Sequence, residues 1–234
     1  MRHLEVIYED NHLIAINKPA GVLVQGDQTG DTPISEEVKF YIKHRYNKPG
    51  DVYLGVIHRL DRPVSGALIF ARTSKGLTRM NALFQQREIQ KRYLAISKWH
   101  PDELNGRIET FLFKDKSKNK VRLMDKPSNR TPNAKKAITE YRLLSEVDGN
   151  YLYEVNPITG RPHQIRAHMQ SVGAPLKGDL RYGAKKALTD ASICLHCFEL
   201  SFVHPVKKEP VTIKANIPKH QEWNRFKNIL KDHE

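Results

Sequence analysis

The chain has 234 residues, enough to bury a full-sized core as one large domain or as two packed lobes. Its 39 Lys and Arg residues against 26 Asp and Glu give a formal net charge of +13, which favours a polyanion as partner. Two cysteines cannot form a disulfide scaffold, and no apolar run approaches the roughly 18 residues of a membrane span. Residues 1–11 lack the apolar core of a signal peptide, so a reducing compartment, the cytoplasm, is expected.

The first part of the chain alternates short apolar runs with turns. Residues 4–8 and 13–16 predict two strands, and the turn that follows, Asn17-Lys18-Pro19-Ala20-Gly21, displays a lysine. Lys18 is a candidate substrate contact, and a solvated lysine is the alternative. Thr32-Pro33 predicts the start of a helix that runs to about Tyr46.

A polar loop, residues 58–66 (HRLDRPVSG), lies between two apolar runs, 52–57 and 67–71, that are expected to be buried strands. Pro63 and Gly66 should make this loop stiff. Asp61 has Arg59 and Arg62 as near neighbours, so its carboxylate is expected to be ionised and held by charge-assisted bonds. The alternative is a solvated turn with a weak surface ion pair.

Apolar spacing predicts a helix over residues 73–86 and then a strand over residues 91–96 that contains Tyr93. Half-buried packing is the ordinary role of a strand tyrosine.

Residues 114–136 form the most basic segment, with nine Lys or Arg against two Asp. Ser, Asn and Pro are interspersed, which indicates a long loop or loose hairpin that follows phosphates. The candidate contacts to the RNA phosphate backbone are Lys116, Lys118, Lys120 and Arg122. A solvated run of charge is the alternative.

Two further strands are expected over residues 137–144 and 151–155, followed by a helix that opens within residues 159–169 and carries Pro162 in its first turn. Ile165 and Met169 should face the core, with His163 and Arg166 on a neighbouring face. His163 and His168 are five apart and do not share a helix face, so no metal site is predicted.

The last part of the chain is expected to contain strands over residues 193–202 and 211–215, and a docked C-terminal helix with Trp223, Phe226 and Leu230. Cys194 and Cys197 should point to opposite faces of their strand as packed thiols. Strands outnumber helices, and the helices are irregularly placed. This pattern favours an α+β fold around a large, mostly antiparallel sheet.

Five stretches together resemble the RluA family of RNA pseudouridine synthases over nearly the whole chain. In family order they are residues 17–21 (NKPAG), 58–61 (HRLD) with 65–66 (SG), 91–95 (KRYLA), 159–168 (TGRPHQIRAH), and 195–196 (LH) followed by 204–205 (HP). Each stretch is weak alone, but their order and spacing make the resemblance specific.

The resemblance implies a single catalytic domain over residues 1–234, without the small N-terminal RNA-binding domain of longer members. It implies a long, bent, mostly antiparallel mixed sheet with helices around it and a central catalytic cleft. The activity implied is isomerisation of uridine to pseudouridine in ribosomal or transfer RNA, without a cofactor or metal. A monomer that does not bind membranes is expected.

The resemblance also implies roles for individual residues. Asp61 matches the catalytic aspartate, Tyr93 the tyrosine that packs on the uracil, and Arg166 the arginine paired with that aspartate. The expected substrate contacts are Arg59, which fills the space of the extruded nucleotide, with His58, Arg161, His163, Leu195 and Lys18.

Two observations leave alternatives open. Pro63-Val64 departs from the commoner Asp-Thr or Ala-Thr of the family, which bears on loop conformation and substrate choice. An inactive RNA-binding or ribosome-assembly protein of the same fold would have the same basic surface. A metal-dependent nuclease is disfavoured because the sequence has no clustered carboxylates for a two-ion site.

Overall fold

The chain divides into two compact units in this computed structural model, which describes residues 3–115 and 120–231. The first unit contains Met1–Gln90 and Cys197–Ile217, and the second contains Lys91–His196 and Pro218–Glu234. The site residues expected from the sequence are divided between these two units.

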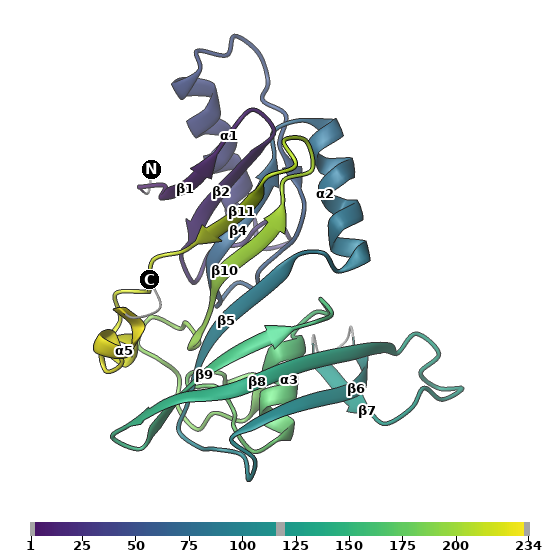
Figure 1. The fold of residues 1–234 in the computed structure, drawn as a ribbon, viewed down its shortest axis with the longest axis vertical. Helices are drawn as coiled ribbons and strands as arrows, with labels where there is room; N and C mark the ends of the chain where they lie inside the picture. The colour runs from purple at the N-terminus through teal and green to yellow at the C-terminus, as the bar shows by residue number, and fades with distance from the viewer. Residues whose placement is uncertain (1–2, 116–119, 232–234) are drawn as a thin grey trace. The chain divides into compact units, whose positions relative to one another are not determined.

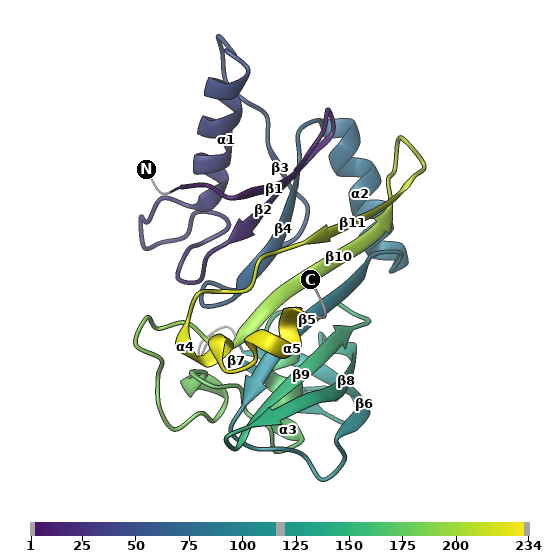
Figure 2. The ribbon, with the colours of Figure 1, turned by 60° about the vertical axis from the view of Figure 1, so that its left-hand side comes forward.

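The first unit is built on antiparallel strands (Figures 1 and 2). Strand β1 (Val6–Glu9) pairs with β2 (Leu13–Lys18), which pairs with β4 (Ser65–Ala71). Strand β3 (Gly55–Val56) also pairs with β4, and β10 (Leu195–Val203) pairs with β11 (Pro210–Lys214). All seven residues of β4 are buried, as expected for its continuous apolar sequence.

Two helices complete the first unit. Helix α1 (Ile34–Arg45) buries Ile34, Val38 and Ile42 along one face. Helix α2 (Ser74–Gln86) contacts β3 and β4. Its first turn is capped by Thr73, whose hydroxyl accepts a hydrogen bond from the Gly76 amide at 3.0 Å.

The second unit contains five antiparallel strands in the order β5-β9-β8-β6-β7. They are β5 (Gln90–Ser97), β9 (Asn150–Pro157), β8 (Lys135–Val147), β6 (Asn105–Asp115) and β7 (Lys120–Met124). Helix α3 (Gln164–Ser171) contacts β7, β8 and β9 (Figure 1). A short 3-10 helix, η1 (Leu180–Tyr182), follows it.

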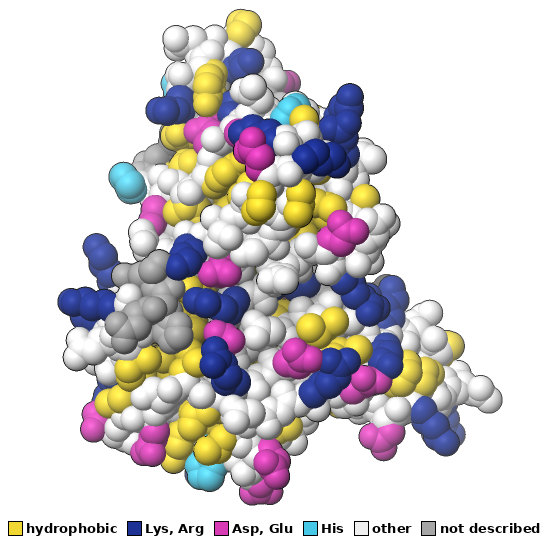
Figure 3. Space-filling model, viewed as in Figure 1, with side chains coloured by type: hydrophobic (Ala, Val, Ile, Leu, Met, Phe, Trp, Pro, Cys, Tyr) yellow, Lys and Arg dark blue, Asp and Glu magenta, His cyan; other side chains and the backbone are white. Residues whose placement is uncertain are grey.

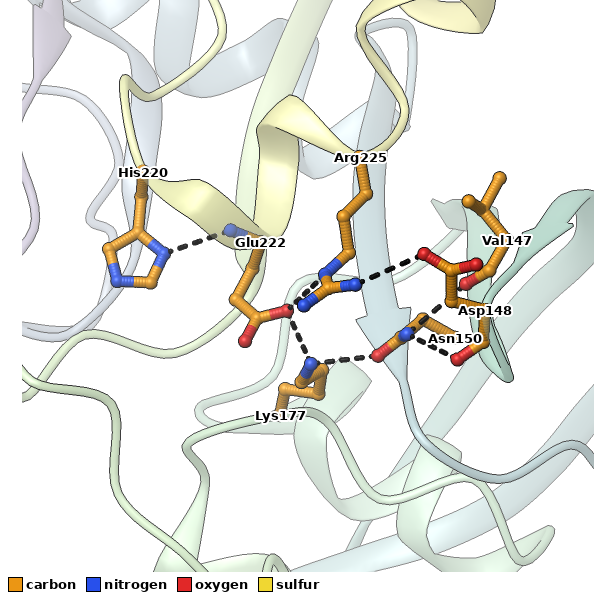
Figure 4. Close-up of polar contacts among 7 residues, drawn as sticks. All are labelled: Val147, Asp148, Asn150, Lys177, His220, Glu222 and Arg225. Atoms are coloured by element: carbon orange, nitrogen blue, oxygen red, sulfur yellow. Dashed lines mark hydrogen bonds and ion pairs between the residues drawn. The ribbon is translucent and has the colours of Figure 1, made fainter.

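The C-terminal segment packs within the second unit. The single helix expected here is two short helices, α4 (Gln221–Asn224) and α5 (Lys227–Lys231). Trp223 of α4, Leu230 of α5 and Phe226 between them are buried, as expected. Figure 4 shows the polar contacts at α4. Glu222 is paired with Lys177, whose ammonium donates to the Asn150 side chain at 2.8 Å, and Arg225 pairs with Asp148 at 3.3 Å. These bonds connect α4 to the turn between β8 and β9.

The structure confirms an α+β fold with mostly antiparallel strands, but it corrects several local predictions. The strand expected over residues 52–57 is reduced to Gly55–Val56, and the long strand β6 was not predicted. Helix α3 begins at Gln164, because His163 has φ of 53° and lies outside the helix, as Pro162 does. Across residues 3–115 and 120–231, no helix combines the length and the apolar composition that a membrane span requires.

Candidate active site

The loop that carries Asp61 is fixed at its C-terminal end by Gly66. Gly66 has φ of +120°, and a Cβ at this position would lie 2.3 Å from the carbonyl oxygen and 2.5 Å from the amide nitrogen of Cys197. Both atoms belong to backbone, which cannot move away as a flexible side chain could. Only glycine fits here, and this explains why the loop ends in Ser65-Gly66.

The turn between β2 and α1 holds the middle of the same loop. The amide of Gly21 donates to the carbonyl of Arg62 at 2.7 Å, and Arg62 Nε donates to the carbonyl of Gly21 at 3.0 Å. The Lys18 ammonium donates to the carbonyls of Pro19 at 2.8 Å and Arg62 at 3.3 Å. Lys18 is fully buried, so the alternative of a solvated lysine is wrong, and its role as a substrate contact stays a prediction. Its contacts support the loop from inside.

The side chains of the loop alternate between the core and the surface. Leu60 and Val64 are buried, whereas Asp61 is half-buried and Arg59 is exposed. A turn closes where the Val64 amide donates to the Asp61 carbonyl at 3.0 Å. The buried neighbours on both sides therefore fix the backbone of Asp61 while its carboxylate remains partly accessible.

The two arginines beside Asp61 are directed to other groups. Arg59 donates to the side chain of Gln25 at 3.4 Å, and Arg62 forms an ion pair with Asp31 at 2.7 Å. Both contacts lie within the first unit. The predicted ion pairs of these arginines with Asp61 stay predictions.

His58 supports the loop at its other end. Its Nε2 accepts a hydrogen bond from the Ile69 amide at 3.1 Å, and its ring stacks on Phe84 of α2 at a centroid distance of 5.2 Å. The histidine therefore connects β4 to α2. The role in substrate binding expected for it stays a prediction.

In the second unit, Arg166 is a buried arginine with a planar, bidentate partner. Its Nε and Nη2 donate to the two carboxylate oxygens of Asp179 at 2.7 and 2.8 Å, and both side chains are almost fully buried. Such a pair has high geometric specificity, and removal of one partner would leave an uncompensated charge in the core. The predicted pairing of Arg166 with Asp61 stays a prediction.

The aromatic ring of Tyr182 lies beside this pair. The Arg166 guanidinium is 5.0 Å and the Lys120 ammonium 5.4 Å from the ring centroid. The Tyr182 hydroxyl accepts from the Val121 amide and is bonded to Nδ1 of His163, both at 2.9 Å. The structure thus brings His163, Arg166 and Lys120 together around Tyr182.

The other polar residues of the 159–168 motif fasten α3 to the strands. Gln164 accepts from the Thr159 hydroxyl at 2.7 Å and donates to Thr139 at 2.9 Å. His168 lies between the hydroxyls of Thr110 and Thr139, at 3.0 and 2.8 Å. Burial lowers the pKa of His168 to about 4, so it is neutral at physiological pH. This histidine is a structural residue of the core.

Three remaining candidates also belong to the second unit. Tyr93 is half-buried in β5, opposite Val155 of β9. Leu195 is buried at the start of β10. Arg161 precedes α3, and its Nε donates to the Lys136 carbonyl at 3.1 Å.

The basic segment is a hairpin, β6–β7, followed by a turn that leads into β8. Lys116 and Lys118 lie outside the described residues. Lys120 and Arg122 are exposed, and Arg122 pairs with Asp115 at 3.3 Å. Lys136 pairs with Glu109, and Lys and Arg side chains adjoin Asp and Glu over β6 and β8 (Figure 3). Part of the positive charge of this segment is therefore compensated by neighbouring carboxylates.

Sequence reasoning missed Asp179 and Tyr182, although a signal was present. The two residues lie between Gly178 and Gly183, which have φ of +83° and +99°. A Cβ on Gly178 would lie 2.5 Å from the Ser192 carbonyl oxygen. Two glycines around Asp-Leu-Arg-Tyr mark a tight turn that displays a carboxylate and a phenol, but the sequence alone does not say what they contact.

Comparisons with known proteins identify the family of this chain. Residues 12–171 match the RNA pseudouridylate synthase family. The tRNA pseudouridine synthase C of Haemophilus influenzae is 35% identical, over 96% of this chain and 97% of that protein. The ribosomal large subunit pseudouridine synthase D of Zymomonas mobilis is 31% identical, over 94% and 71%.

A solved structure shows the same fold. Human RNA pseudouridylate synthase domain containing 4 superposes with a TM-score of 0.75 at 24% identity, covering 92% of this chain and 89% of the human chain. The family match and the similarity to two synthases along nearly the whole chain agree with the five motifs of the sequence. The chain therefore belongs to the RluA family of RNA pseudouridine synthases, which are isomerases that act on RNA.

Proposed function

We propose that this chain converts specific uridines of ribosomal or transfer RNA to pseudouridine, with Asp61 as the catalytic carboxylate. The observation that carries this proposal is the loop of residues 58–66. Its backbone is held by Gly66, Lys18 and Gly21, while the Asp61 side chain is only half-buried. A pre-organised, accessible carboxylate is what a nucleophile or base in RNA isomerisation requires.

The chemistry consists of detaching uracil from its ribose, turning it while it is captive, and rejoining it through carbon 5. Asp61 provides the carboxylate, either by attack on ribose or base or by removal of a ribose proton. Arg166 provides a fixed, planar positive charge of the kind that stabilises a carboxylate or a developing oxyanion. No metal or redox cofactor is part of the proposal, because the net reaction is an isomerisation.

The target uridine must leave its stack before a carboxylate can reach it, at a cost of a few kcal/mol. Tyr93 is proposed to stack on the extruded uracil, which would offset about 1 to 3 kcal/mol of that cost. Arg59 is proposed to occupy the vacated space in the RNA. Arg59 is exposed, and its bond to the Gln25 side chain is long at 3.4 Å, which is compatible with such a movement.

The target RNA can be identified by mapping pseudouridine across total RNA from cells with and without the gene. The proposal predicts loss of one or a few sites in ribosomal or transfer RNA, and recovery of these sites with the wild-type gene but not with Asp61→Asn. Unchanged maps would refute it. Recovery by Asp61→Asn would refute the assigned residue.

The alternative is an inactive RNA-binding or ribosome-assembly protein of the same fold. It requires the basic surface but not a fixed carboxylate. A phenotype of the gene deletion that Asp61→Asn rescues fully, together with unchanged pseudouridine maps, would favour this alternative. A monomeric state, a cytoplasmic location and a single domain over residues 1–234 remain predictions.

A further inference from the structure

Tyr182 is a buried residue to which neither the family motifs of the sequence nor the proposed chemistry gives a task. It is 1% exposed and ends η1, three residues after Asp179. Its amide donates to the Asp179 carbonyl at 3.1 Å, so the phenol and the carboxylate are displayed by the same turn. Any change at this turn therefore acts on both groups together.

The Tyr182 hydroxyl connects three elements. It accepts from the Val121 amide of β7 and forms a hydrogen bond with Nδ1 of His163, which precedes α3, both at 2.9 Å. A single oxygen atom thus fixes the start of β7 and the start of α3 relative to η1.

The ring of Tyr182 and the carboxylate of Asp179 restrain Arg166 in two directions. Asp179 holds the guanidinium through two parallel bonds in its own plane, at 2.7 and 2.8 Å. Tyr182 holds it from a second side, with the guanidinium carbon 5.0 Å from the ring centroid. Bidentate bonding alone allows the pair to pivot, and the ring opposes that movement.

We propose that Tyr182 is a positioning residue that fixes the orientation of Arg166 and ties it to strand β7 of the basic hairpin. This inference rests on the proposed function, because it assigns Arg166 a part in the reaction. RNA that binds along β7, where Lys120 also faces the Tyr182 ring, would then be held in register with Arg166.

The test is Tyr182→Phe, which keeps the ring but removes the hydroxyl. The buried Val121 amide would lose its acceptor in this variant. This loss should lower the population of molecules in which η1 and β7 are held together by about ten- to a hundred-fold. The single-turnover rate at saturating enzyme should therefore fall about tenfold, whereas the Kd for RNA should change less than about twofold. A merely structural role would leave the rate per folded molecule unchanged.

Tyr141→Phe is the matched control. Tyr141 is also buried in the second unit, and its hydroxyl donates to the Glu103 carbonyl at 3.0 Å. The substitution removes the same atom from a tyrosine for which no bond to Arg166 is described. Tyr141→Phe should react at the wild-type rate. An equal loss in both variants, or a wild-type rate in Tyr182→Phe, would overturn the proposal.

The proposed function and this inference fail in different ways. A wild-type protein that forms no pseudouridine on any cellular RNA refutes the function itself. An active wild type with an equally active Tyr182→Phe variant refutes only the role of Tyr182. Hydrogen exchange at the Val121 amide checks the anchor without an activity assay, because exchange as slow in Tyr182→Phe as in wild type would also overturn the proposal.

Discussion

Replacement of Gly66 by alanine tests the fixed end of the loop of residues 58–66. The substitution adds a Cβ that would lie 2.3 Å from the Cys197 carbonyl oxygen, on a backbone with φ of +120°. The unfavourable φ costs about 1 to 3 kcal/mol for a residue with a side chain. The overlap with backbone atoms adds to this, so the free energy of unfolding should fall by more than about 4 kcal/mol.

Gly30→Ala separates the two contributions. Gly30 also has a positive φ, +78°, but a Cβ there would have nothing within 4 Å. Only the backbone strain should appear in this variant, about 1 kcal/mol or slightly more. The difference between the two variants therefore measures the close approach of Gly66 to Cys197.

The assay is urea denaturation of the full chain, followed by circular dichroism. With an m-value near the upper end for small proteins, about 3 kcal/mol per molar urea, the midpoint for Gly66→Ala should fall by about 1 M or more. The midpoint for Gly30→Ala should fall by a few tenths of that amount. If both variants unfolded at the same urea concentration, the account of how this loop is held would be refuted.

Three further predictions concern RNA contacts and pH. Changing the basic candidates of the 114–136 segment to Ser should make the slope of log RNA affinity against log salt concentration shallower by about 0.9 for each lost duplex contact. An unchanged slope would mean that these side chains are only solvated. The residues are Lys116, Lys118, Lys120 and Arg122. Arg59→Ala should reduce activity on a folded RNA far more than on a flexible strand with the same uridine, and equal losses would contradict a role in extrusion. His168 has a pKa of about 4 when folded, below its ordinary value, so the unfolded chain binds a proton that the folded chain does not. The contribution of neutral His168 to the free energy of unfolding is complete above pH 6.5, and up to about 3 kcal/mol of it is lost as the pH falls towards 4. The free energy of unfolding in urea should therefore fall less between pH 7 and pH 4.5 in His168→Gln than in wild type.

Elements with a strong local signal were predicted well from the sequence. The apolar spacing located α2 to within one residue, and the continuous apolar run of β4 indicated its burial. Strand β6 was missed because only Ile108 and Leu112 are buried among its eleven residues, so it lacks the regular alternation of a half-buried strand. Its pairing with β8 determines its structure, and pairing is not a local property.

The residues of the candidate site were found by motif, but their contacts were not. Nothing in the local sequence indicated that Arg62 bonds to Gly21, 41 positions away. A solvated Lys18 was the alternative to a substrate contact, because most lysines are exposed. Only the fold supplies the carbonyls that satisfy Lys18 inside the core. Local patterns thus identified the reactive residue types, and long-range contacts decide how they are held.

The most direct test of the central claim compares wild type with Asp61→Asn in two measurements on the same RNA. Asparagine keeps the shape of aspartate but is neither a competent nucleophile nor a base at neutral pH. We expect no pseudouridine from Asp61→Asn under single-turnover conditions, with RNA affinity equal to or higher than that of wild type, because one negative charge is removed near a polyanion. Appreciable turnover by Asp61→Asn would contradict the assignment of Asp61 as the catalytic carboxylate.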